Sequence, residues 1–154
     1  MNIIFKKINK LYESDPNIAK PKIEVSGSKV SLFFPLNYFV FNFKEGEYGK
    51  IIFHDCLMFR VGDPNDEGLL MLSQQEVIND SVWSLENFPE IEVNSFFEIE
   101  NSDWSSILKH KGFINSDVNI ESIDRSKYKH FVFFMKDGTF ECVCSNFEEE
   151  IPIN

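Results

Sequence analysis

Cations are missing from the middle third of the chain. No Lys, Arg or His occurs between Val61 and Leu108, a run of 48 residues that carries eleven of the 25 Asp and Glu side chains. The first sixty residues hold nine Lys and Arg against six acidic residues, so this acidic block accounts for the net charge of -10. A surface of this kind repels anions and attracts a cationic partner or a metal ion.

Several other features are scarce, and each scarcity excludes a class of function. The chain has two Arg and a pI near 4.7, so it lacks the basic footprint that nucleic-acid binding requires. No apolar run approaches the roughly 20 residues that span a bilayer, and the N-terminus has no apolar signal core. Three cysteines are too few for a disulfide scaffold. We therefore expect a cytoplasmic protein with reduced thiols and no membrane association.

Alanine is nearly absent, since Ala19 is the single example, whereas Phe occurs 17 times. Phe and Ile favour strands and Ala is the best helix former, so the composition favours sheet. A length of 154 residues is typical of one domain with its own core. We predict a single α+β domain over residues 1–154, mainly an antiparallel twisted β-sheet with two or three short helices.

Local patterns place these elements. Helical spacing of apolar residues and capping residues predict short helices. They span 1–12, 73–80 and 103–110. Alternation of apolar and polar residues predicts strands at 22–26, 29–34, 38–43, 50–61 and 91–100. Gly27-Ser28 suits a two-residue hairpin turn between the first two strands. In the strand at 91–100, we expect the Glu side chains on a solvated outer face.

The C-terminal region carries the clearest hairpin signal, Asp137-Gly138 between two apolar runs. With these residues as the loop, Lys136 opposes Thr139 and Phe133 opposes Cys142. The core face then holds Phe131, Phe133, Met135, Phe140, Cys142 and Cys144. The opposite face holds His130, Val132, Phe134, Lys136, Thr139, Glu141, Val143 and Ser145.

Candidate metal and catalytic patterns have simpler structural interpretations. Cys142-x-Cys144 has the wrong spacing for a zinc knuckle, and His130 lies on the other hairpin face, so we expect structural thiols. His54 and Cys56 could supply two metal ligands on one strand, but no second pair follows them. The segment 63–68 resembles a calcium loop that has Gln74 where the bidentate Glu belongs. We predict no catalytic residue, no metal and no cofactor.

The segment from Tyr128 to Cys144, with Asn101-Ser-Asp-Trp104 upstream, resembles the C-terminal hairpins of small bacterial proteins. Some of those proteins are similar to immunity proteins of polymorphic toxin systems. The resemblance covers about a fifth of the chain and includes no catalytic motif. It implies a single-domain cytosolic binder that blocks a toxin and does no chemistry itself.

These observations predict a non-catalytic acidic binding protein, most concretely an immunity protein that neutralises a cationic toxin domain. The candidate partner-binding residues are Asp63, Asp66, Glu67, Glu92, Glu98, Glu100 and Asp103. The alternative is a small enzyme or ligand-binding protein with a pocket lined by His54, His130 and an acidic residue. A subunit whose Phe-rich strands extend the sheet of a partner is a third hypothesis.

Overall fold

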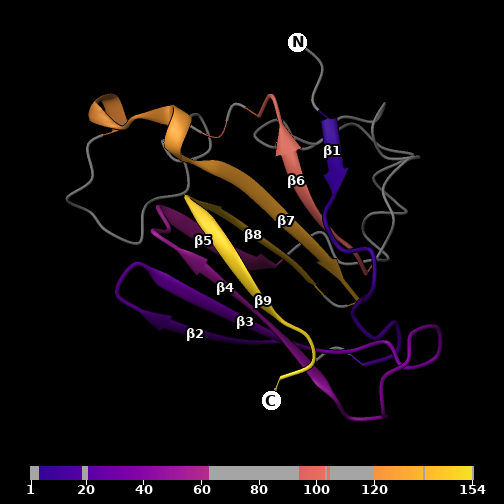
Figure 1. Cartoon of the computed structure of the whole chain (residues 1–154). Coiled ribbons are helices and arrows are strands. Elements are labelled where there is room, and N and C mark those ends of the chain that lie inside the picture. Colours follow the sequence, from indigo (N-terminus) through magenta and orange to yellow (C-terminus); the bar gives the residue numbers. More distant parts are fainter. Residues whose placement is uncertain are drawn as a thin grey trace.

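The computed structural model describes residues 4–18, 21–62, 94–102, 104, 120–136 and 138–153. These residues form two antiparallel sheets (Figure 1). The five-stranded sheet has the order β1-β6-β7-β8-β5, and the four-stranded sheet has the order β2-β3-β4-β9. The first comprises β1 (Ile4–Lys7), β5 (Met58–Gly62), β6 (Phe96–Glu100), β7 (Lys129–Met135) and β8 (Gly138–Cys144). The second comprises β2 (Lys22–Ser26), β3 (Lys29–Pro35), β4 (Tyr48–His54) and β9 (Asn146–Glu150).

Phenylalanine rings join the two sheets into a sandwich with a common core. The ring of Phe34 on β3 lies 4.7 Å from that of Phe133 on β7, measured between centroids. Phe53 on β4 stacks on Phe140 of β8 at 5.1 Å. Large aromatic side chains bury much apolar area with few torsions to fix, so they supply most of the stabilisation of such a core. The abundance of Phe is thus explained by packing between sheets.

The predicted α+β class is wrong, because the described residues form an all-β fold. Their helical elements are two single 3-10 turns, η2 (Ile120–Ser122) and η3 (Arg125–Lys127), and Trp104 is in addition an α-helical residue. In place of the helix predicted at 1–12, β1 pairs with β6, with Phe5 opposite Ile99. Leu11, one of the apolar residues whose helical spacing predicts that helix, is 81% exposed. Tertiary strand pairing overrides the local helical spacing here.

The strand predicted at 38–43 is also wrong, because this segment forms turns. The amide of Phe39 donates to the side-chain oxygen of Asn37 at 3.0 Å, and the amide of Phe43 donates to the carbonyl of Phe41 at 2.8 Å. Local hydrogen bonds of this kind compete with a sheet ladder. The helix predicted at 73–80 lies outside the described residues, as does the helix at 103–110 apart from Trp104.

Both predicted hairpins exist. Ser26 pairs with Lys29, which leaves Gly27-Ser28 as a two-residue turn with Gly27 at a φ of 60°. In the C-terminal hairpin, Met135 pairs with Gly138, so the register differs by two residues from the predicted one. A shift of two preserves the face of every side chain. The predicted core face is therefore confirmed, and all six of its residues are buried in the sandwich.

The strand predicted at 50–61 is instead two strands in different sheets. The chain leaves the four-stranded sheet after His54 and enters the five-stranded sheet at Met58. The later step from β8 to β9 crosses between the same two sheets at Ser145, whose amide donates to the carbonyl of His54 at 3.0 Å. Two crossings at one corner thus bring Cys56 near the end of β8.

Candidate functional site

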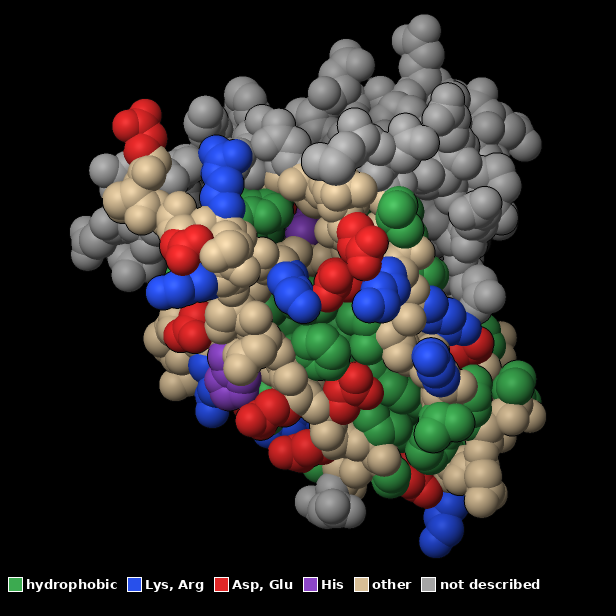
Figure 2. Space-filling view, turned by 45° about the horizontal axis from the view of Figure 1, so that its top comes forward, with side chains coloured by type: hydrophobic (Ala, Val, Ile, Leu, Met, Phe, Trp, Pro, Cys, Tyr) green, Lys and Arg blue, Asp and Glu red, His purple; other side chains and the backbone are tan. Residues whose placement is uncertain are grey.

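A cavity of about 330 Å³ lies where β6 ends and β7 begins, and we call it the His130 cavity. Its lining residues are Glu98, Ile99, Glu100, Asn101, Ser102, Trp104, Tyr128, Lys129 and His130. The pairing of Ile99 with His130 explains why these two chain segments meet. Figure 2 shows a hollow on this face of the molecule with a histidine side chain at its base and acidic and basic side chains around it.

A buried polar network lies beneath the cavity. Nε2 of His130 lies 2.9 Å from Oε2 of Glu141, and Nδ1 of His130 lies 2.6 Å from the hydroxyl of Ser102. Arg60 on the neighbouring strand β5 forms an ion pair with the other oxygen of Glu141. The side chains of His130 and Glu141 are almost completely buried, and such groups require partners because their desolvation is costly.

The electrostatics of this network determine its hydrogen-bond directions. Burial by itself would raise the pKa of Glu141, but the hydrogen bond from His130 and the positive charges of His130 and Arg60 lower it below its ordinary value. An ionised Glu141 can only accept, so Nε2 of His130 carries a proton. Nδ1 of His130 accepts a hydrogen bond from Ser102 when the imidazole is neutral and donates one to the Ser102 oxygen when it is protonated. The network therefore holds the Ser102 hydroxyl at the cavity.

The walls of the cavity suit a positively charged group. The rings of Trp104 and Tyr128 meet edge to face with centroids 6.2 Å apart, and the acidic residues Glu98 and Glu100 are among the residues that line the cavity. Carboxylates and aromatic faces together bind Lys and Arg side chains. The ammonium of Lys129 lies 3.3 Å from Glu98, and its side chain is more than half exposed, so this cation can move away into solvent.

The cavity brings together residues from two separate sequence hypotheses. Glu98 and Glu100 come from the predicted partner-binding set, and His130 comes from the predicted pocket. The remaining partner-binding candidates lie outside the described residues, and so does the segment resembling a calcium loop. These candidates are Asp63, Asp66, Glu67, Glu92 and Asp103. His54 does not join His130, because it lies in the other sheet beside Glu148.

The solvated acidic face predicted for the strand at 91–100 needs correction within its described part. Glu98 lies on the same strand face as Phe96, which is fully buried in the sandwich core. Phe97 and Ile99 on the opposite face are buried as well. Sequence reasoning also missed Ser102, because its partner His130 is 28 residues away along the chain. One sequence signal was available: polar residues follow the predicted strand at 91–100 directly, at the end of the sheet where the cavity lies.

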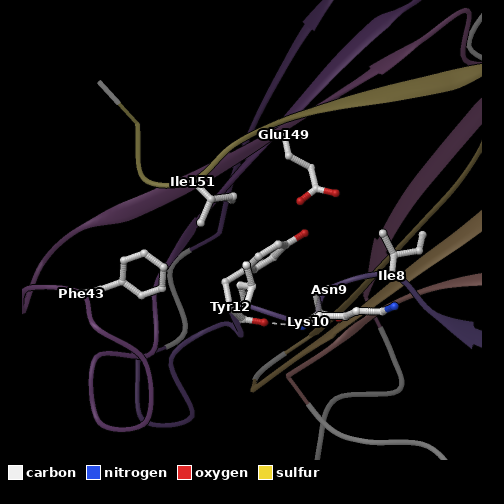
Figure 3. A pocket seen from close by; sticks show the side chains of 8 residues that line it. Ile8, Asn9, Lys10, Tyr12, Phe43, Glu149 and Ile151 are labelled. Atoms are coloured by element: carbon white, nitrogen blue, oxygen red, sulfur yellow. Dashed lines mark hydrogen bonds between the residues drawn. The ribbon is translucent and has the colours of Figure 1, made fainter.

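A second pocket, of about 580 Å³, opens beside β9 (Figure 3). Its walls include Phe43 and Ile151, and the hydroxyl of Tyr12 points toward the carboxyl of Glu149. Burial, followed by the negative charge of Glu149, raises the pKa of Tyr12, and burial raises the pKa of Glu149. This pocket has one carboxyl and the ammonium of Lys10, so its charges cancel. It offers less to a cationic partner than the His130 cavity.

Three thiols form the clearest metal-ligating group within the described residues. The sulfurs of Cys56, Cys142 and Cys144 lie within 4.8 Å of one another, and all three residues are buried and free of disulfides. Hydrogen bonds from Cys142 and Cys144 hold the pKa of Cys56 well below its usual range, whereas burial raises the pKa of Cys142. Only Cys142 and Cys144 are close together in the sequence. Cys56 joins them because the chain crosses between the two sheets at this corner.

No helix within the described part of the chain is long and apolar enough to cross a membrane. The chain matches no protein-family model, and no curated protein or solved structure is significantly similar to it. The comparisons therefore leave the residues of the site as the basis for a functional proposal.

Proposed function

We propose that the chain is a non-catalytic binding protein, most concretely a cytoplasmic immunity protein that neutralises a basic toxin domain. The observation that carries this proposal is the His130 cavity, where Glu98, Glu100, Trp104 and Tyr128 meet at one end of a sheet. A Lys or Arg of the partner enters the cavity and takes the place of the ammonium of Lys129 beside Glu98. The net charge of -10 assists the encounter over longer distances.

Binding exchanges one cation for another beside Glu98. The Glu98–Lys129 pair is largely accessible to water on the Lys129 side, and such pairs contribute at most about 1 kcal/mol. Displacing Lys129 is therefore inexpensive. An Arg that contacts the rings and a carboxylate of the cavity loses more water than Lys129 does and gains charge-assisted hydrogen bonds, which is the pattern of interface hot spots.

The test uses a purified toxin domain encoded by the gene next to this one. Replacement of Glu98 and Glu100 together by Gln is expected to slow association and flatten its salt dependence. In the unmodified chain, association should weaken as the Debye length shrinks from about 30 Å at 0.01 M to about 10 Å at 0.1 M salt. Replacement of Glu148 and Glu150 on β9 by Gln makes the same charge change in the other sheet.

Stopped-flow association rates across a salt series measure both variants. The proposal predicts a loss for the β6 variant and a much smaller change for the β9 variant. Equal effects of the two variants would mean that association depends on net charge alone. Unchanged rates in the β6 variant would mean that the cavity is not part of the interface. A gene neighbourhood without any toxin would contradict the immunity function itself.

A second candidate, a small enzyme, is favoured by a specific observation. The chain of contacts from Ser102 through His130 to Glu141 has the composition of a nucleophile, a base and a group that orients the base. Nucleophilic catalysis at Ser102 would require a substrate carbonyl in the His130 cavity. Of the two histidines in the alternative pocket hypothesis, His130 lines this cavity and His54 does not.

A fluorophosphonate probe separates this candidate from a purely structural network, because such probes phosphonylate activated serines, with fluoride as the leaving group. Labelling of Ser102, abolished by Ser102→Ala and by denaturation, would support an enzyme. The absence of labelling in the folded wild-type protein would count against it. Ser126, an exposed serine whose hydroxyl bonds to Asp124 at 2.6 Å, is the internal comparison for non-specific labelling.

A further inference from the structure

We propose that Cys56, Cys142 and Cys144 form a three-thiolate site for a trivalent thiophilic metalloid ion, of which As(III) is the representative. The three sulfurs converge within 4.8 Å, although Cys56 is 86 residues from Cys142 along the chain. Convergence of every cysteine in the sequence on one point requires both sheet crossings at the same corner. A thiol cluster of this kind selects soft ions over hard ones.

The coordination number excludes a standard zinc site. Structural zinc takes four ligands in a tetrahedral arrangement. Within the described residues, the metal-ligating group comprises the three cysteines alone, with no His, Asp or Glu among its members. Trivalent arsenic binds three sulfurs in a pyramid and keeps a lone pair in the fourth direction, so three thiols complete its coordination.

The charge of the product points to the same ion. The cluster is packed among the sandwich-core residues, where an uncompensated charge is expensive. Three thiolates leave a net negative charge around a monovalent or divalent ion and none around a trivalent one. In the reaction, As(OH)3 forms a bond to each of three sulfurs, and each hydroxide leaves with a thiol proton as water. No charge is created in the core and no oxidant or reductant is needed.

The sheet crossing provides a route to the sulfurs. Cys56 lies in the short connection between β4 and β5, next to Asp55, which has a φ of 53°. The hydroxyl of Ser145 donates to the carboxyl of Asp55 at 2.9 Å and holds this connection in place. Exposure of Cys56 requires the amides of Cys56 and Leu57 to release the carbonyls of Ser28 and Val143, but it breaks no ladder pair, because the pairs of β4 end at His54 and those of β5 begin at Met58.

The experiment is a titration of the fully reduced, folded chain with arsenite, followed by native mass spectrometry. The expected product is one arsenic per chain with the loss of three waters, and the three thiols become protected from alkylation. Cys56→Ala leaves two thiols and should weaken binding by about a hundredfold, since each ligand carries a large part of the total metal affinity. Parallel titrations use Zn(II) and Cu(I).

Each outcome decides the proposal. Stoichiometric arsenic with three protected thiols supports it, also if Cys56→Ala fails to fold, because that result comes from the wild-type chain. Absence of arsenic binding at a one-to-one ratio would overturn it. Equal binding by a folded Cys56→Ala variant would show a two-thiol site and also overturn it. Binding of Zn(II) or Cu(I) in preference to As(III) would contradict the charge argument.

Discussion

Removing the charge of Arg60 should destabilise the fold through Glu141. The substitution Arg60→Met keeps the aliphatic stem but leaves the buried Glu141 carboxylate with His130 as its hydrogen-bond partner. Breaking a buried ion pair costs about 3–5 kcal/mol. The Arg60 side chain is 29% exposed and His130 still donates to Glu141, so we expect a smaller loss of about 2–3 kcal/mol in the free energy of unfolding.

A double-mutant cycle isolates the interaction. Glu141→Gln removes the charge that needs Arg60, and Gln still accepts a hydrogen bond from Nε2 of His130. Arg60 can then turn toward water, so this variant should lose only about 1–2 kcal/mol. The double variant contains neither charge and should be about as stable as Glu141→Gln alone. The two single effects are therefore expected to be non-additive.

Urea unfolding at pH 7, followed by circular dichroism, measures the cycle. With a slope of about 2 kcal/mol per molar urea, Arg60→Met should lower the midpoint by about 1 M. The interaction energy is the difference between the double variant and the sum of the single variants. Additive losses would refute the reasoning, because they would mean that Arg60 stabilises the fold through something other than the Glu141 charge.

Three further predictions follow from burial and packing. Stability should fall as the pH drops below the ordinary Glu value of 4.5, because a lowered folded-state pKa makes the ionised form of Glu141 stabilising above that pH, and acid titration of Glu141→Gln should show a weaker fall. Gly49→Ala should lower the melting temperature in calorimetry, since its Cβ would lie 2.7 Å from Phe34 and from Ile151, at a cost of about 1–3 kcal/mol. Phe53→Ala should cost about 3–5 kcal/mol in urea unfolding, because Phe53 is fully buried between the sheets.

Much of the local β structure was predictable from sequence, because turn chemistry and side-chain parity are short-range properties. Gly27 tolerates the positive φ of its turn, and this fixes the register of β2 on β3. In the C-terminal hairpin, the alternation of apolar residues was enough to identify the core face even though the loop was displaced. A register error of two residues leaves that alternation unchanged.

Only the tertiary structure decided which segments meet. The spacing of Ile4 and Leu11 is compatible with a helix, and the alternative appears only when β1 finds β6 about 90 residues later. The break between β4 and β5 could not be predicted either, because the pattern over 50–61 predicts one continuous strand. At this break the chain passes from one sheet to the other. The contacts of Ser102 with His130 and of Cys56 with Cys142 depend on these non-local pairings. Composition and periodicity determine the preference for sheet and the faces of its strands, whereas the sites arise from long-range packing, which local sequence does not encode.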